Sequence, residues 1–259
     1  MMSLIVPSIL LCERKYIMNL VIHHHLGIGD SFMCNGLVRH YAKMNYQNVF
    51  VISKNKCKDM ISYMYRDDPK ISVIPIQDNG NEHGAVNTIL KSPSFKGSKF
   101  IKSGFESIDI CCQRYIDANM SSQFSFDIAF YEECGLYYSD RWDKWKFDRD
   151  YEAEEVVYNK LNPNNEEYIF VHDDPSRGMI IPSIGSKYKE IRNDVTINPL
   201  NIIRILENAK EIHAMESSIK CLIDQYSTVK CPKYLYTNIR PDGHGKTLRS
   251  GSIHDWIII

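Results

Sequence analysis

Residues 18–30 read MNLVIHHHLGIGD, and this stretch decides how the first part of the chain is expected to fold. The apolar residues 19–23 predict a short buried strand, and Gly27 and Gly29 let the following loop turn tightly and approach a ligand closely. Residues 31–44 then carry apolar side chains at helical spacing. A strand, a glycine loop and a helix in this order indicate the first unit of a parallel α/β sheet.

The same pattern continues through the first half of the chain. Strands are expected at 48–53 and 71–76, with a helix at 56–64 between them. This alternation predicts a parallel sheet with crossover helices. Residues 78–104 are rich in Gly, Ser, Asn and Lys. They predict a further helix at 83–91, followed by a loop.

The second half repeats the alternation of strands and helices. The expected strands are 167–172, 178–182, 194–197, 210–214 and 233–236, and the expected helices are 150–161, 198–208 and 217–226. A polar tail follows the last strand. The sequence therefore predicts an α/β protein with two Rossmann-like halves that face a central cleft.

Residues 120–150 are rich in both aromatic and charged side chains. They indicate either a segment that connects the two halves or a cover over one flank of the first sheet. The expected division is an N-terminal extension at 1–17, a first α/β domain at 18–145 and a second α/β domain at 146–259.

Composition excludes several classes of protein. The 259 residues include 31 Lys+Arg and 32 Asp+Glu, so no basic excess exists for binding a nucleic-acid backbone. No apolar run is long enough for a transmembrane helix. The apolar residues 3–12 lack the basic leader of a signal peptide. The eight cysteines form no C-x-x-C pair, which indicates a reducing, cytoplasmic location.

The first loop that could carry chemistry is HHLGIGDS, residues 24–31. Its G-x-G-D pattern lacks the third glycine of a dinucleotide-binding motif and the lysine of a P-loop. Asp30 is either a cap of the following helix or a general base at the mouth of a cleft. His25 is expected to face the cleft and contact a sugar or phosphate. No ligand partner completes a zinc site around the three histidines, so no metal is expected.

The second loop, HDDPSRG at 172–178, follows the carboxyl end of a strand, where open α/β sheets bind ligands. Arg177 offers a planar, permanently charged group that is suited to phosphate. Asp173 and Asp174 could bind Mg²⁺, but a solvated, turn-forming role is expected for them.

In the third loop, EIHAMESSIK at 211–220, a strand ends and a helix begins. The hydroxyls of Ser217 and Ser218 with the first N–H groups of the helix can receive a diphosphate, or one serine can be an ordinary helix cap. Glu216 could accept hydrogen bonds from ribose hydroxyls. His213, on the preceding strand, is expected to contact the same ligand.

Taken together, these loops resemble the two-domain glycosyltransferases of the GT-B type. The resemblance lies in H-x-L-G-x-G-D-S at 24–31 and E-I-H-A-M-E-S-S-I-K-C-L-I-D at 211–224, and covers about residues 18–240. Bacterial heptosyltransferases and fucosyltransferase-like enzymes are similar in having a Gly-Asp loop after the first strand. The segment F-Y-E-E-C-G-L-Y-Y-S-D-R-W at 130–142 is similar to their connecting segments.

The resemblance implies transfer of a sugar from a nucleotide-sugar donor to a glycan or other hydroxyl acceptor, with inversion and without a metal. It also implies that the domain 18–145 binds the acceptor and that the domain 146–259 binds the nucleotide-sugar. Asp30 would be the base, and Arg177, Ser217 and Ser218 would contact the diphosphate. His172 and Glu216 would line the donor pocket. No cofactor is implied beyond the nucleotide-sugar, which is a co-substrate.

The chain departs from the family pattern at one pair of residues, and other functions remain to be weighed against sugar transfer. Fucosyltransferase-like enzymes carry a basic pair where Asp173 and Asp174 stand, which argues against GDP-fucose as donor. A non-catalytic nucleotide- or glycan-binding protein of the same architecture, or a subunit that docks a partner through 124–147, remains an alternative. An epimerase or another Rossmann oxidoreductase is disfavoured, because Lys187 and Tyr188 are adjacent and form no Tyr-x-x-x-Lys motif.

Overall fold

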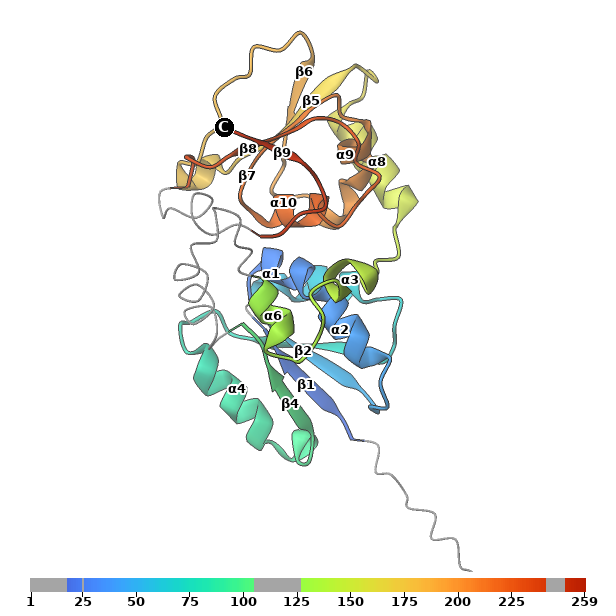
Figure 1. Cartoon of the computed structure of the whole chain (residues 1–259), viewed down its shortest axis with the longest axis vertical. Coiled ribbons are helices and arrows are strands. Elements are labelled where there is room, and N and C mark those ends of the chain that lie inside the picture. The colour runs from blue at the N-terminus through green and yellow to red at the C-terminus, as the bar shows by residue number, and fades with distance from the viewer. Residues whose placement is uncertain (1–17, 25, 105–126, 241–249) are drawn as a thin grey trace, which may run out of the picture.

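The computed structural model describes residues 18–24, 26–104, 127–240 and 250–259. Two α/β halves lie one above the other along the long axis, and each is built around its own parallel sheet (Figure 1). The expected α/β fold with two Rossmann-like halves is therefore confirmed. The expected extension 1–17 lies outside the described residues.

The first sheet has the strand order β3-β2-β1-β4. Its strands are β1 (Leu20–His23), β2 (Val49–Lys54), β3 (Ile71–Ile76) and β4 (Lys99–Lys102). The three strands expected in this half are confirmed, whereas β4 was missed. It pairs parallel to β1, with Val21 opposite Phe100. As a four-residue edge strand with two lysines, β4 carries little of the apolar signal that marks a buried strand.

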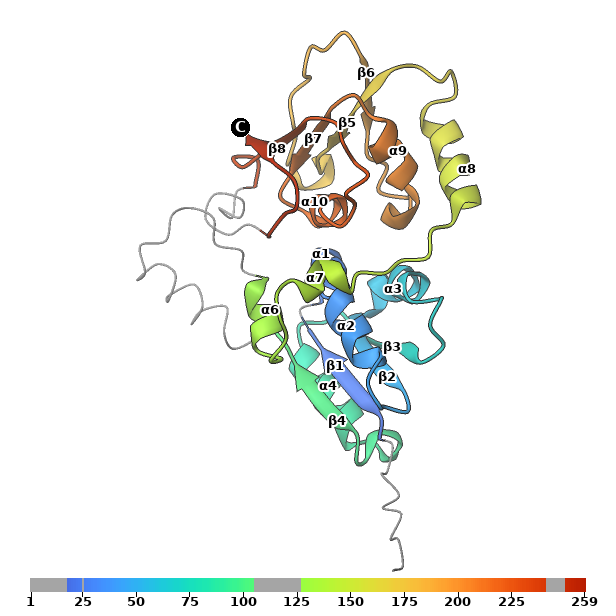
Figure 2. The same ribbon diagram turned by 45° about the vertical axis from the view of Figure 1, so that its right-hand side comes forward.

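The helices of the first half cover both faces of this sheet (Figure 2). They are α1 (Ile28–Met33), α2 (Asn35–Ala42), α3 (Lys58–Met64), α4 (Glu82–Lys91), α6 (Ile128–Glu132) and α7 (Asp140–Asp143). Because strand side chains alternate, Leu20 and Ile22 join the core under α2 and α3, while Val21 packs with Val86 of α4.

The single helix expected at 31–44 is divided, with α1 ending and α2 beginning around Cys34. Tyr131 of α6 causes this break. Its hydroxyl donates to the carbonyl of Met33 at 2.7 Å and accepts from the N–H of Leu37 at 3.2 Å. It therefore takes the place of the ordinary bond between these two backbone groups. Residues 128–143 thus pack on the first half, as expected for a segment that covers its flank.

The second sheet has the order β6-β5-β7-β8-β9, and its described pairs are all parallel. Its strands are β5 (Tyr168–His172), β6 (Lys189–Arg192), β7 (Ile212–Met215), β8 (Lys233–Tyr236) and β9 (Trp256–Ile258). The expected strands at 178–182 and 194–197 are wrong. Only Met179 bridges back to Asp174, and 194–197 form a turn. The polar tail expected after 233–236 contains a further strand, β9, with the apolar sequence Trp-Ile-Ile.

Helices cover one face of the second sheet. They are α8 (Tyr151–Leu161), α9 (Ile203–Asn208) and α10 (Ser218–Ile223), and a 3₁₀ turn (Pro199–Asn201) precedes α9. Their apolar side chains pack against Phe170, Ile212 and Ala214. The opposite face, with Ile169 and Val171, is covered by an irregular segment that contains Ile181.

The two halves meet where α1 packs directly against α10 (Figure 2). A second contact is made by Gly251, whose N–H donates to Asp127 at 2.9 Å. No helix among the described residues is long and apolar enough to cross a bilayer. The five cysteines in the described part, Cys34, Cys57, Cys134, Cys221 and Cys231, are free.

Candidate functional site

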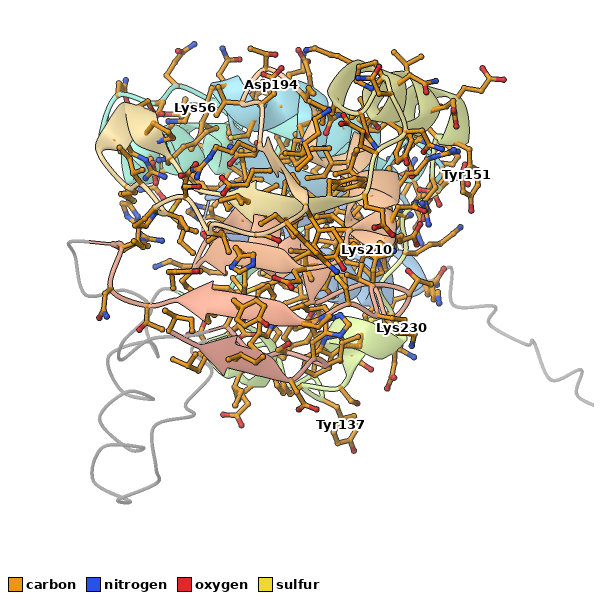
Figure 3. The ribbon with its side chains drawn as sticks, turned by 90° about the horizontal axis from the view of Figure 1, so that it is seen from above. Lys56, Tyr137, Tyr151, Asp194, Lys210 and Lys230 are labelled. Carbon is orange, nitrogen blue, oxygen red and sulfur yellow. The ribbon has the colours of Figure 1, made fainter. Side chains whose placement is uncertain are left out.

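A cavity of about 850 Å³ lies between the two halves. From the first half it is lined by Leu26, Gly27, Ile28, Gly29, Asp30, Met33, Lys54, Lys56 and Cys57. From the second half the lining includes Phe170, His172, Asp173, Asp174, Arg177, Asn193, Asp194, Met215, Glu216, Ser217, Ser218, Cys221 and Arg240. Figure 3 shows Lys56 and Asp194, which come from opposite halves, on the same side of the molecule. The three loops singled out in the sequence all reach this cavity.

Asp30 lies in the cavity wall and also stabilises the loop before it. Its Oδ2 accepts from the N–H of Gly27 at 3.1 Å, so Gly27 is the N-cap and Asp30 is the third residue of α1. A Cβ on Gly27 would lie 2.5 Å from this oxygen, which explains the glycine. The alternative that Asp30 itself caps the helix is therefore wrong: the N-cap is Gly27, and Asp30 bonds back to it from inside the first turn while also lining the cavity.

Gly29 allows two helices to come together. A Cβ at this position would lie 3.3 Å from the Cα of Ser218 and 3.4 Å from the Sγ of Cys221. Its lack of a side chain brings the start of α1 against the start of α10. The glycine loop of the first half and the serine loop of the second thereby become neighbouring parts of one site.

His172, at the end of β5, is 8% exposed. In the described structure neither ring nitrogen has a hydrogen-bond partner of acceptable geometry. Burial lowers the pKa of His172 to about 4, against smaller opposing effects of Asn193 and Asp174. A neutral imidazole therefore lines the cavity at neutral pH.

The two aspartates that follow have different roles. Asp173 is 2% exposed, and its Oδ2 accepts from the N–H of Ile181 and from Arg192. The expected solvated role is therefore wrong for Asp173, because this carboxylate is paired inside the protein. Asp174 does form the expected turn, since it accepts from Ser176 and from Nε of Arg177, both at 2.5 Å. This bond holds Arg177 at the cavity while its side chain remains 58% exposed.

The third loop brings Glu216, Ser217 and Ser218 to the cavity. Oε1 of Glu216 accepts from the N–H of Ser250 at 3.2 Å and from its hydroxyl at 2.9 Å, so this carboxylate anchors the C-terminal segment. Ser217 stands at the N-cap of α10 without a side-chain cap bond, and its buried hydroxyl has no partner in the described structure. The hydroxyl is therefore available to a ligand.

Two sequence-derived candidates do not join this group. The described lining of the cavity does not include His213, which stacks on Tyr234 at 4.5 Å and contacts Glu211 at 3.1 Å. Its position on β7 points it to the sheet face opposite Ala214. His25 lies outside the described residues. Within those residues, no three His, Cys, Asp or Glu side chains are grouped as a metal site.

The sequence reasoning missed the basic residues of the cavity, Lys54, Lys56 and Arg240. Lys54 ends β2 and pairs with Glu82 at 2.7 Å and Asp78 at 3.2 Å. The two lysines could have been found from the sequence. Lys54 and Lys56 come directly after the predicted strand 48–53, at the edge where parallel sheets bind ligands. Arg240 donates to the carbonyl of Glu216 at 3.1 Å, a contact that no local pattern reveals.

Comparison with known proteins identifies the fold. No protein-family model and no curated protein matches the chain. Among solved structures, it is similar to a family 9 glycosyl transferase from Veillonella parvula, with a TM-score of 0.56 and 8% identity over 94% of this chain and 87% of that one. For E. coli ADP-heptose lps heptosyltransferase II the TM-score is 0.48 and the identity is 8%, over 93% of this chain and 90% of that one. For E. coli heptosyltransferase WaaC with ADP the TM-score is 0.42 and the identity is 12%, over 93% of this chain and 92% of that one.

Proposed function

We propose that this chain is a glycosyltransferase that moves a sugar from a nucleotide-sugar to a hydroxyl of a glycan or other acceptor. The observation that carries the proposal is the convergence of loops from both halves on one cavity of about 850 Å³. The first half contributes a carboxylate, Asp30, and the second contributes polar groups suited to a diphosphate. The structural likeness to a family 9 glycosyl transferase supports this reading of the fold.

On the donor side, the proposed diphosphate contacts are Arg177 and the hydroxyls of Ser217 and Ser218. When the bond between the anomeric carbon and the phosphate oxygen breaks, negative charge develops on the leaving diphosphate. The guanidinium and hydroxyl donors stabilise this charge more strongly in the transition state than in the ground state. His172, neutral and buried, offers the donor a hydrogen-bonding group without a charge.

On the acceptor side, Asp30 is the proposed general base. It would take the proton of the acceptor hydroxyl as that oxygen attacks the anomeric carbon from the face opposite the diphosphate. Such a single displacement inverts the anomeric configuration. The bond from Gly27 fixes the carboxylate, which favours a defined geometry over a mobile one. We propose that no metal takes part.

The experiment that tests the donor assignment is a thermal-shift screen with UDP, GDP, ADP and CMP. A ligand that binds only the folded state at 100 times its Kd stabilises that state by about 2.7 kcal/mol. We expect one nucleoside diphosphate to raise the Tm, and Arg177→Ala to reduce this rise. Arg204→Ala is the control, because Arg204 pairs with Glu155 away from the cavity. No response to any nucleotide, or equal effects of the two variants, would remove the donor assignment.

A further inference from the structure

A second cavity, of about 410 Å³, lies on the second half away from the central cleft. It is formed by the turn that leads into β8 and by the residues just before β9. Lys230, Lys233 and His254 line it, together with Asp255. In Figure 3 the strand arrows of the second sheet point away from the side on which Lys210 and Lys230 lie. The cavity therefore belongs to the edge opposite the carboxyl ends that form the central site.

In the part of the chain that the structure describes, the two lysines of this cavity form no ion pair with a carboxylate. Lys233 is 5% exposed, and its Nζ donates to the carbonyl of Cys231 at 2.8 Å. Within the described residues, no carboxylate lies within 4.0 Å of Nζ of Lys230 or Lys233. By contrast, Lys189 and Lys210, which also precede or begin strands of this sheet, pair with glutamates at 2.8 and 2.6 Å. A buried, uncompensated ammonium group is costly unless a counter-charge binds it.

The surrounding groups do not supply that counter-charge. Burial lowers the pKa of Lys233, Lys230 lowers it further, and Cys231, Asp224 and Asp255 oppose this. Asp224 is already bound by Lys220 at 2.9 Å. Asp255 is the acidic residue in the described lining of this cavity, and it is exposed. One exposed carboxylate therefore stands against two lysines.

His254 adds a third basic group to the wall. Its Nε2 lies 3.1 Å from the carbonyl of Ile223 and 3.0 Å from that of Tyr226, so this nitrogen carries a proton in either charge state. Burial and Lys233 lower the pKa of His254, while Asp224 and the two carbonyls oppose the shift. An anion in the cavity would therefore favour protonation of the second ring nitrogen.

We propose that this second cavity binds a phosphate or phosphate monoester, held by Lys230, Lys233 and His254. Its volume exceeds that of a phosphate group, and the exposed Pro232 and Ile253 add apolar surface for an organic part of the ligand. A soluble phosphorylated metabolite and an anionic lipid headgroup share this chemistry. The site is separate from the central cleft and does not depend on the proposed transferase activity.

The test is titration of the whole protein with inorganic phosphate, followed by calorimetry and by NMR of the histidine side chains. We expect saturable binding and a rise in the pKa of His254. The NMR signal of His254 is identified by its absence in the variant His254→Gln. Lys233→Met and Lys230→Ala should each weaken binding by about tenfold or more, because each removes a charged hydrogen-bond donor to the anion. Lys230 is exposed, so its variant should keep the fold even if Lys233→Met does not.

Two controls separate this site from other basic groups. Lys210→Ala removes a paired lysine on the same edge and should bind phosphate as the wild type does. Arg177→Ala removes a cation of the central cleft and should keep the phosphate-dependent rise in the pKa of His254, which lines the second cavity. Absence of this rise in the wild type, or a rise that survives Lys230→Ala and Lys233→Met, would overturn the proposal. Loss of the rise in Arg177→Ala would also overturn it, because the phosphate would then act from the cleft.

A vesicle experiment distinguishes the two sources of the phosphate. Phosphatidylcholine vesicles with and without phosphatidic acid are sedimented with the protein. If phosphatidic acid recruits the wild type but not Lys230→Ala, and inorganic phosphate competes, the site takes a lipid headgroup. If the protein binds inorganic phosphate but not these vesicles, the site takes a soluble phosphate. Both results support a phosphate site.

Discussion

His172, where β5 ends in the wall of the central cavity, combines deep burial with a position beside the proposed donor. A histidine placed there must be neutral, because an imidazolium would lose most of its hydration without gaining a carboxylate partner. Its neutral ring can accept or donate one hydrogen bond, which suits recognition of an uncharged part of a donor better than charge compensation.

This environment predicts how stability depends on pH. The pKa of His172 falls from 6.5 to about 4 on folding, so the unfolded state binds a proton more readily. The stability that depends on neutral His172 is complete above pH 6.5 and is lost as pH falls towards 4, by about 3 kcal/mol in total. Urea denaturation at several pH values should show a steeper loss for the wild type than for His172→Gln. Parallel profiles would contradict the assignment.

Residue types and their positions predicted much of the lining of the central cavity. Asp30, His172, Arg177, Glu216, Ser217 and Ser218 all line it, because each lies at the carboxyl end of a strand or in the loop or helix start that follows one. The hydrogen-bond partners of single carboxylates were not predictable. Asp173 accepts from Arg192, 19 positions along the chain, and Glu216 accepts from Ser250, 34 positions along. Such pairings depend on how distant segments come together.

Among the elements, the contact between α1 and α10 matters most for the site. Each helix follows a loop that lines the cavity, and Gly29 sets their separation through its contacts with Ser218 and Cys221. The sequence reasoning assigned this glycine to close approach of a ligand. The close approach is real, but the neighbour is another helix of the same chain.

Substitution of Gly29 should therefore disturb the packing between the halves. Gly29→Val forces α1 and α10 apart and should lower the free energy of unfolding by about 1–3 kcal/mol, as overpacking does. Gly29→Ala should cost less, because its Cβ needs only a few tenths of an ångström and alanine favours a helix by about 1 kcal/mol. Chemical denaturation measures both. A Gly29→Val protein as stable as the wild type would show that the helices do not pack this closely.

The element boundaries that the sequence reasoning missed share a physical origin. Local periodicity predicted one helix at 31–44, whereas the Tyr131 hydroxyl divides it, from 94 positions beyond Leu37. Strands β4 and β9 lie at sheet edges, where short, partly exposed strands show weak alternation. Central strands such as β1 and β5 were predicted because both their faces are buried.

For the whole molecule, a buried polar network outside the cavity lining joins the two halves. Asp127 and Arg141 are both 0% exposed and form an ion pair. Asp127 also accepts from the hydroxyl of Tyr138 at 2.8 Å and from the N–H of Gly251 at 2.9 Å. One carboxylate thereby ties a segment of the second half to the helices that pack on the first.

Removal of this carboxylate should be costly. Asp127→Ala leaves Arg141 buried without its partner and should lower the free energy of unfolding by about 3–5 kcal/mol. The control Glu155→Ala breaks a pair with Arg204 in which both side chains are over 40% exposed, and it should cost under about 1 kcal/mol. Urea denaturation compares the two. Similar losses in both variants would contradict the role of Asp127 as a link between the halves.

Sugar transfer in the central cleft is tested most directly by the variant Asp30→Asn. Asparagine can still accept the hydrogen bond of Gly27, so the loop and nucleotide binding should be preserved while the base is lost. The measurement is release of nucleoside diphosphate from a panel of nucleotide-sugars with a hydroxyl acceptor. We expect turnover by the wild type and a loss of at least about 100-fold in Asp30→Asn with unchanged nucleotide affinity. Nucleotide binding without turnover by the wild type would contradict the transferase and favour a binding protein, and full activity in Asp30→Asn would place the base elsewhere.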